Sequence, residues 1–121
     1  MAYRRLDGAV GVIQPHGVKD AFKRLALERT AARDPSTKRR RVWAQNLYEE
    51  AVRELLDRLA RGEKIVFVAA PLKRKERKMV WLDPALWKQV HEVSACHDVS
   101  TAAIVRTACL AYLEARGIKL G

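Results

Sequence analysis

The fold of this chain is decided by the stretch from Lys73 to Gly117, which reads KRKERKMVWLDPALWKQVHEVSACHDVSTAAIVRTACLAYLEARG. After the basic run, the short apolar segment from Met79 to Leu82 favours a strand. Asp83-Pro84 predicts a helix start, because aspartate caps free amides and proline is tolerated at the first helical position. Ser100-Thr101 predict a second helix, which stops near Gly117. We therefore expect a strand, a helix to about Asp98, a short turn and a second helix.

The second of these helices is apolar nearly all round, which is typical of a helix that is buried on every side. Its apolar residues are Ile104, Val105, Ala108, Cys109, Leu110, Ala111, Tyr112 and Leu113. One strand and two helices can neither pair the strand nor bury such a helix by themselves. The stretch therefore needs a partner, and a second copy in the same chain would serve.

The N-terminal half predicts the same order of elements. Ala9 to Ile13 is a short apolar run suited to a strand, although its glycines weaken this prediction. Helical apolar spacing begins at Val18 and continues to about Ala32. Asp34-Pro35-Ser36 then marks a break, after which a long helix is expected to about Arg61, with a glycine cap after it.

The segment that joins the halves is apolar at first. Ile65 to Ala70 is rich in β-branched residues and predicts either a buried extended connection or a strand. Pro71 to Glu76 predicts a linker.

Short matches relate the two halves. Val12-Ile13-Gln14-Pro15 resembles Trp81-Leu82-Asp83-Pro84, and both halves close on Ala-Arg-Gly, at Gly62 and at Gly117. We interpret residues 1–121 as a single domain with a first repeat at 9–62, a linker at 63–76 and a second repeat at 77–117. The first repeat holds extra residues around Thr30 to Trp43.

The element order, the junction Val80-Trp81-Leu82-Asp83-Pro84 and the helix start Ser100-Thr101 resemble the ribbon-helix-helix family of DNA-binding proteins. The match is best from Met79 to Gly117 and weaker in the first half, which lacks the aspartate cap. The resemblance implies a mainly α fold in which a short two-stranded antiparallel ribbon lies over four helices. With both copies in one chain, it implies an intramolecular pseudo-dimer that is a monomer in solution.

Within the family, the tandem arrangement is similar to the VirC-type virulence proteins of bacterial Agrobacterium Ti plasmids, which are linked to T-DNA border processing. The resemblance implies sequence-specific binding of double-stranded DNA. The protein would act as a repressor, or as an accessory factor for a DNA-processing enzyme or ATPase.

In this family the ribbon enters the major groove and presents alternate side chains to base edges. The family junction places Arg77, Met79 and Trp81 outward, with Arg77 as the strongest base reader; Trp81 is also a candidate for the core. A register shifted by one residue would turn Lys78 to the DNA instead. By the repeat alignment, the first strand would present Gly8, Val10 and Val12. The second strand would then determine which DNA sequence is bound, and the first would mainly fit the shape of the groove without donating hydrogen bonds to bases.

Phosphates would be held by helix N-termini and basic residues. The candidates are Ser100 and Thr101 at one helix start, Lys38, Arg39, Arg40 and Arg41 in the first repeat, and Lys73, Arg74 and Lys75 beside the ribbon. Alternatively, the basic runs are solvated surface, and the two hydroxyls only cap their helix.

Composition agrees with a polyanion as partner. Lys and Arg total 24 against 14 Asp and Glu, a net charge of +10, which favours nucleic acid first and an anionic membrane surface second. No stretch approaches the roughly 18 apolar residues of a membrane span, and no signal-peptide run follows Met1. We therefore expect a cytoplasmic protein without a membrane partner, in which Cys96 and Cys109 stay reduced.

The sequence shows no constellation typical of an enzyme. Its three histidines are scattered and it has no phosphate-binding glycine loop, so we expect no metal, no cofactor and no catalysis. Two other functions stay open. One is a protein-interaction module, antitoxin-like or a scaffold, with a basic surface. The other is a binder of RNA or single strands, which usually needs more aromatic residues on a sheet.

Overall fold

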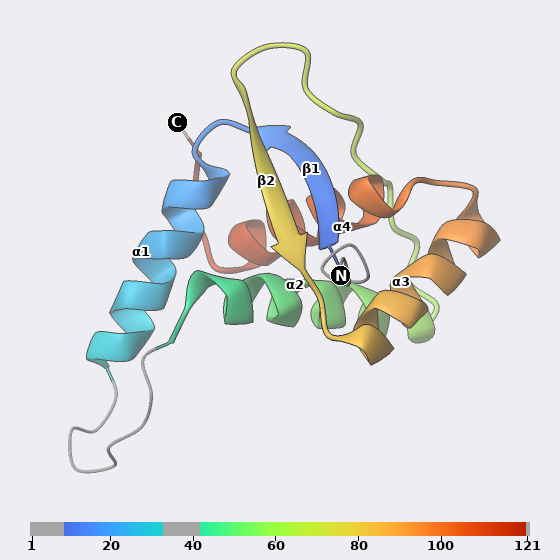
Figure 1. The fold of residues 1–121 in the computed structure, drawn as a ribbon, viewed down its shortest axis with the longest axis horizontal. Helices are drawn as coiled ribbons and strands as arrows, with labels where there is room; N and C mark the ends of the chain where they lie inside the picture. The colour runs from blue at the N-terminus through green and yellow to red at the C-terminus, as the bar shows by residue number, and fades with distance from the viewer. Residues whose placement is uncertain (1–8, 33–41, 121) are drawn as a thin grey trace, which may run out of the picture.

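The computed structural model describes residues 9–32 and 42–120. The elements follow in the order β1 (Ala9–Pro15), α1 (Val18–Ala31), α2 (Ala44–Ala60), β2 (Lys75–Trp81), α3 (Pro84–His97) and α4 (Thr101–Ala115). The fold is mainly helical with one two-stranded antiparallel sheet, as the sequence predicted, and the order strand, helix, helix occurs twice (Figure 1).

The two strands pair along their whole length although about 60 residues separate them. Ala9 is opposite Trp81, Val12 is opposite Lys78 at the centre, and Pro15 is opposite Lys75. Side chains alternate between the faces of a strand, and here Val10, Val12 and Val80 are buried on one face. The ribbon thus has an inner face that belongs to the core and an outer face.

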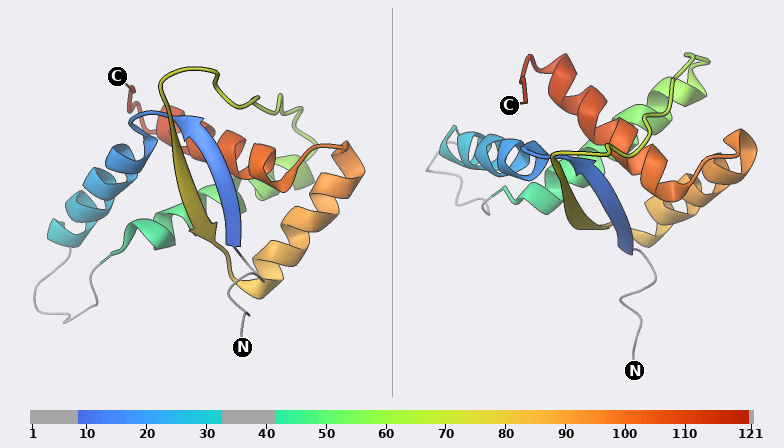
Figure 2. Two further views of the ribbon diagram at one scale, coloured as in Figure 1. Left: turned by 45° about the horizontal axis from the view of Figure 1, so that its top comes forward. Right: turned by 90° about the horizontal axis from the view of Figure 1, so that it is seen from above.

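The helices form a layer on the inner side of the ribbon. Helices α2 and α4 cross each other there, while α1 and α3 lie toward opposite ends of the molecule (Figures 1 and 2). The ring of Phe22 from α1 stacks on Tyr48 of α2 at 4.2 Å between centroids and on Tyr112 of α4 at 5.5 Å. These contacts join elements of both halves in one hydrophobic core.

The crossing helices bury side chains with the same spacing. Helix α2 buries Leu47, Tyr48, Ala51, Val52, Leu55 and Leu56, and α4 buries Ile104, Val105, Ala108, Cys109, Tyr112 and Leu113. Each set follows the pattern i, i+1, i+4, i+5, i+8, i+9, which is a wide helical stripe. Helix α4 additionally buries Arg106 and Thr107, so it is the more enclosed of the two.

The strands also correspond, but not as the sequence match predicted. Both strands have seven residues, and two residues separate each strand from its helix, so Pro15 corresponds to Trp81. The sequence match between Val12–Pro15 and Trp81–Pro84 had instead aligned Val12 with Trp81, which is an error of three residues. An odd shift reverses the faces of a strand. The predicted outward positions of Val10 and Val12 are therefore wrong, because both side chains are buried.

Most predicted helix boundaries agree with the structure. The Asp83 side chain accepts a hydrogen bond from the amide of Ala85 at 3.1 Å, and Ser100 accepts one from Ala103 at 3.0 Å, so both predicted caps are confirmed. Helix α2 begins only at Ala44, because Trp43 is extended, which shortens the predicted long helix. Neither prediction for Ile65–Ala70 is right: the segment forms no strand, and it is an irregular connection that is largely exposed and not buried.

A buried arginine holds this connection to the core. The Arg106 guanidinium donates to the carbonyl of Val68 at 2.7 Å and to that of Ile13 at 3.1 Å. Burial lowers the pKa of Arg106. Thr107 adds a hydrogen bond from the Val68 amide to its hydroxyl at 2.8 Å. Helix α4 thereby ties β1 and the connection between the halves to one another.

A group of charges closes the other end of α4. Glu50 accepts hydrogen bonds from Arg29 at 3.0 Å and from the Tyr112 hydroxyl at 2.7 Å, and Glu54 pairs with Arg116 at 2.7 Å. Partial burial raises the pKa of Glu50, but the hydrogen bonds from Arg29 and Tyr112 outweigh this and leave its pKa below the ordinary value. Burial and the Glu50 hydrogen bond raise the pKa of Tyr112 to about 12.

We predict that Arg106→Ala lowers the free energy of unfolding by about 2 kcal/mol, because two buried carbonyls lose a charged donor. Urea unfolding measures this change. Tryptic cleavage after Lys73 or Arg74 should also become faster, since the connection loses its anchor. Arg53→Ala, on the exposed surface of α2, is the control and should stay within about 0.5 kcal/mol. A variant with wild-type stability and wild-type cleavage would show that Arg106 anchors nothing.

We predict that Glu50 contributes stability that acid removes. Its pKa is lowered on folding, so the contribution is present above the unfolded value of about 4.3 and is lost as the pH falls through the folded value. Denaturant unfolding of Glu50→Gln and the wild type should differ most at pH 7 and converge below about pH 4. Glu92→Gln, on the exposed surface of α3, serves as the control. A difference that stays constant with pH would contradict this assignment.

Candidate nucleic-acid interface

The outer face of the ribbon carries different side chains on its two strands. From β2 it presents Lys75, Arg77, Met79 and Trp81, and from β1 it presents Ala9, Gly11, Ile13 and Pro15. Met79 is 42% exposed and Trp81 is 40% exposed, so Trp81 does not belong to the core. The β2 set contains two cations and an indole N–H, whereas the β1 set has no side-chain donor or acceptor.

Arg77 lies over Gly11 of the neighbouring strand. A Cβ atom placed on Gly11 would stand 3.5 Å from Nη2 of Arg77 and 3.4 Å from Sδ of Met79. These are ordinary contact distances, so a Cβ atom would fit here, whereas a longer side chain at position 11 would enter the space that Arg77 and Met79 occupy. The guanidinium of Arg77 therefore reaches across to the neighbouring strand.

Lys78 points to the other side of the ribbon. Its Nζ atom lies 5.6 Å from the centre of the Tyr48 ring, which belongs to α2 beneath the ribbon. A cation over an aromatic face is an attractive arrangement. The register that would turn Lys78 outward is therefore wrong, and this residue does not lie on the outer face with Arg77.

The N-terminus of α1 is already occupied by a carboxylate from the opposite strand. Glu76 accepts hydrogen bonds from the amides of Gly17 at 3.1 Å and Lys19 at 2.7 Å, and from Nε2 of Gln14 at 2.9 Å. A negative charge at this end of a helix is favourable. Since Glu76 fills this position, α1 does not offer its first amides to an outside anion.

Helices α2 and α4 begin on opposite sides of the ribbon (Figure 1). Both helices rise from the ribbon side toward the back of the molecule, so their N-terminal ends are the ones nearer the ribbon (Figure 2). Among the described residues, their first turns contain no acidic side chain. Ser100 and Thr101 lie at the start of α4, as predicted. Each start carries the positive end of the helix dipole, which favours an anion, and at α4 the Ser100 hydroxyl already accepts the Ala103 amide.

Two further predicted cations lie where β2 begins. Lys73 and Arg74 are exposed, and Arg74 adopts a left-handed backbone with φ of 50°. The Arg74 carbonyl accepts a hydrogen bond from the His16 amide at 2.7 Å, which fixes this turn beside the end of β1. Lys38, Arg39, Arg40 and Arg41 lie outside the described residues.

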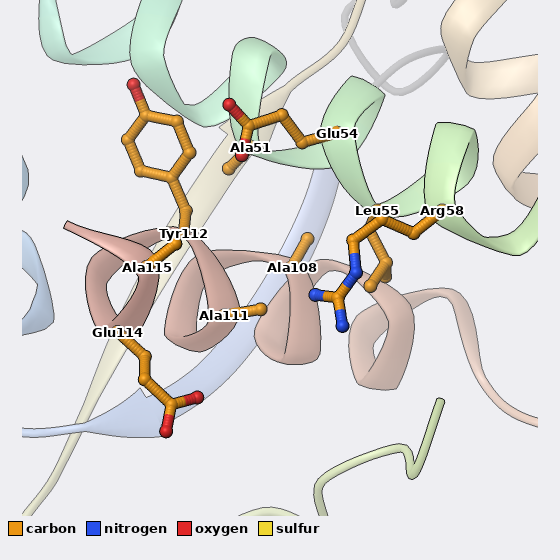
Figure 3. A pocket seen from close by; sticks show the side chains of 9 residues that line it. All are labelled: Ala51, Glu54, Leu55, Arg58, Ala108, Ala111, Tyr112, Glu114 and Ala115. Atoms are coloured by element: carbon orange, nitrogen blue, oxygen red, sulfur yellow. The ribbon is translucent and has the colours of Figure 1, made fainter. Parts of the chain in front are cut away.

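A pocket of about 370 Å³ lies between α2 and α4, away from the ribbon surface (Figure 3). Its lining includes the methyl groups of Ala51, Ala108 and Ala111 and the charged side chains of Glu54 and Arg58. Glu54 is paired with Arg116, and Arg58 with Glu63 at 2.9 Å. All its lining residues come from α2 and α4, so the pocket contributes no side chain to the outer face of the ribbon.

The sequence reasoning missed the role of Gly11 and the outward position of Ile13. The useful signal was the spacing from each strand to the residue before its helix, Gly17 in one half and Asp83 in the other. Gly17 has a φ of 104°, a conformation that glycine adopts easily, and it holds the N-cap position without being an aspartate. Aligning Gly17 with Asp83 places Gly11 at the position of Arg77.

Within residues 9–32 and 42–120, no helix is both long and apolar enough to cross a membrane. The same residues contain no group of three or more side chains suited to hold a metal ion. Comparison of the chain with protein-family models, with curated proteins and with solved structures finds no match.

Proposed function

We propose that this protein binds double-stranded DNA through the outer face of its β1–β2 ribbon, which enters the major groove. The observation that carries the proposal is the exposed row of Lys75, Arg77, Met79 and Trp81, which lies between the N-termini of α2 and α4. A two-stranded ribbon fits the major groove, and side chains on its outer face reach base edges.

Each part of the surface has a distinct task in this proposal. Arg77 donates two hydrogen bonds to the O6 and N7 atoms of a guanine, the commonest specific contact of arginine with DNA. Met79 makes apolar contact with bases near the centre of the ribbon. The starts of α2 and α4 bind phosphates on the two sides of the groove, and Lys73 and Arg74 add charge at one end.

The fold proposed for this function is a ribbon-helix-helix pseudo-dimer within one chain. Two observations support it: the strands correspond residue by residue, and α2 and α4 bury the same pattern of positions. In such an arrangement one chain supplies both strands of the ribbon and acts as a monomer. A tandem pseudo-dimer in one chain is the form that resembles the VirC-type proteins. On this resemblance we propose a role as a repressor or as an accessory factor in DNA processing.

A protein-interaction module with a basic surface is the competing function. The net charge of +10 is compatible with both functions, but it does not explain why donors gather on the outer face of β2. Binding measured against salt separates the two. A duplex binder should lose affinity steeply as the salt concentration rises, because the counterions that binding displaces from DNA then gain less entropy on release. It should also enrich one motif from a random duplex pool.

We predict that Arg77→Ala loses the enriched motif and binds its duplex about 5-fold to 150-fold more weakly, because one bidentate contact with guanine is worth about 1–3 kcal/mol. Arg24→Ala removes the same charge from the exposed surface of α1 and is the matched control. It should keep the motif and most of the affinity. Fluorescence anisotropy with the selected duplex and a point-mutated duplex measures both effects.

Two outcomes would contradict the proposed function. Equal binding of every duplex by the wild type and by Arg77→Ala would leave only a nonspecific basic surface. Absence of duplex binding at about 50 mM salt would favour the protein-interaction module.

A further inference from the structure

The two strands of the ribbon differ at every equivalent outward position. The strands have the same length and the same spacing to their helices. Ala9 is therefore equivalent to Lys75, Gly11 to Arg77, Ile13 to Met79, and Pro15 to Trp81. The β2 residue is the larger one in every pair except Ile13 and Met79, which are of similar size, and the β1 residues have no side-chain hydrogen-bonding group. Every hydrogen-bonding side chain of the outer face therefore lies on one strand, while the backbone is nearly symmetric.

At the equivalent positions Gly11 and Arg77, the difference between the strands also affects how the side chains lie on the outer face. Arg77 fills the space above Gly11, where Nη2 comes within 3.5 Å of a Cβ position. An arginine at position 11 would extend symmetrically toward β2 and compete for the same space above the central pair Val12–Lys78. The space holds one long side chain, from β2, and a second long side chain at position 11 would have to share it.

We propose that the protein recognises a non-palindromic duplex site and binds it in one orientation, which the Gly11–Arg77 pair determines. This inference rests on the proposed function and specifies its target. Symmetric dimers recognise sites whose two halves mirror each other, because both halves of the protein make the same contacts. Here β2 places hydrogen bonds in one half of the site, and β1 offers the other half only backbone and apolar contact.

The chain carries a natural position for testing orientation. Cys96 on α3 is exposed and Cys109 on α4 is buried, with burial raising the pKa of the Cys109 thiol, so a thiol reagent should label Cys96 alone. Helix α3 lies at one end of the molecule, beyond one side of the ribbon (Figure 1). An iron–EDTA group attached to Cys96 then cleaves the DNA near that end.

The first experiment cleaves the selected duplex with the labelled wild type. We expect cleavage on one side of the site, with at least about a fivefold excess over the other side, as one lost guanine contact implies. Equal cleavage on both sides of a specifically bound motif would overturn the inference and leave the proposed function intact. Failure to bind any duplex would overturn both.

The second experiment exchanges the pair. In Gly11→Arg/Arg77→Gly the guanidinium extends from β1, so we expect the stronger cleavage to move to the opposite side of the same site. A variant that binds the site with cleavage on the original side would show that other residues determine the orientation.

A single substitution tests the same inference in case the exchanged variant does not fold. Gly11→Leu fills the space above Gly11 without adding a donor, and extended backbone accepts leucine. We expect its discrimination at the guanine to fall about tenfold, while Ile13→Leu on the same strand keeps it. Thermal unfolding of both variants checks that the fold is kept. Wild-type discrimination by Gly11→Leu would show that the space above Gly11 does not position Arg77.

Discussion

The structure depends on covering one face of a ribbon that could not persist alone. An isolated two-stranded sheet is marginal in water, and these strands come from opposite halves of the chain. The inner face gains its stability from α2 and α4, on which Val10, Val12 and Val80 are fully or almost fully buried. Because those two helices also bury each other, neither half has a complete core without the other.

This requirement leaves the outer face free to vary. The inner positions and the helical stripes keep the same spacing in both halves, since both must pack at the same crossing. The outward positions carry no such demand, and they differ: those of β1 are small or apolar, and those of β2 are large and include two cations. A single chain permits this difference, whereas two identical chains would carry the same residues on both strands.

Local signals allowed much of the fold to be predicted. Asp83 and Ser100 cap the helices that follow them, and the spacing of apolar residues located all four helices within the described part. The faces of β1 were predicted wrongly because a four-residue match outweighed the spacing between strand and helix. Arg106 could not be assigned, since its carbonyl partners lie 38 and 93 residues away in sequence. The role of Gly11 likewise appears only when the opposite strand is in place.

We propose that the outer face of the ribbon and the starts of α2 and α4 form the DNA surface. Backbone amide spectra recorded while a selected duplex is added to the labelled protein test it most directly. We expect the largest shifts at Gly11, Arg77, Met79 and the first turn of α4, and small shifts at Ala111 and Ala115 beside the pocket between α2 and α4. Shifts concentrated around that pocket, with an unchanged ribbon, would contradict the account.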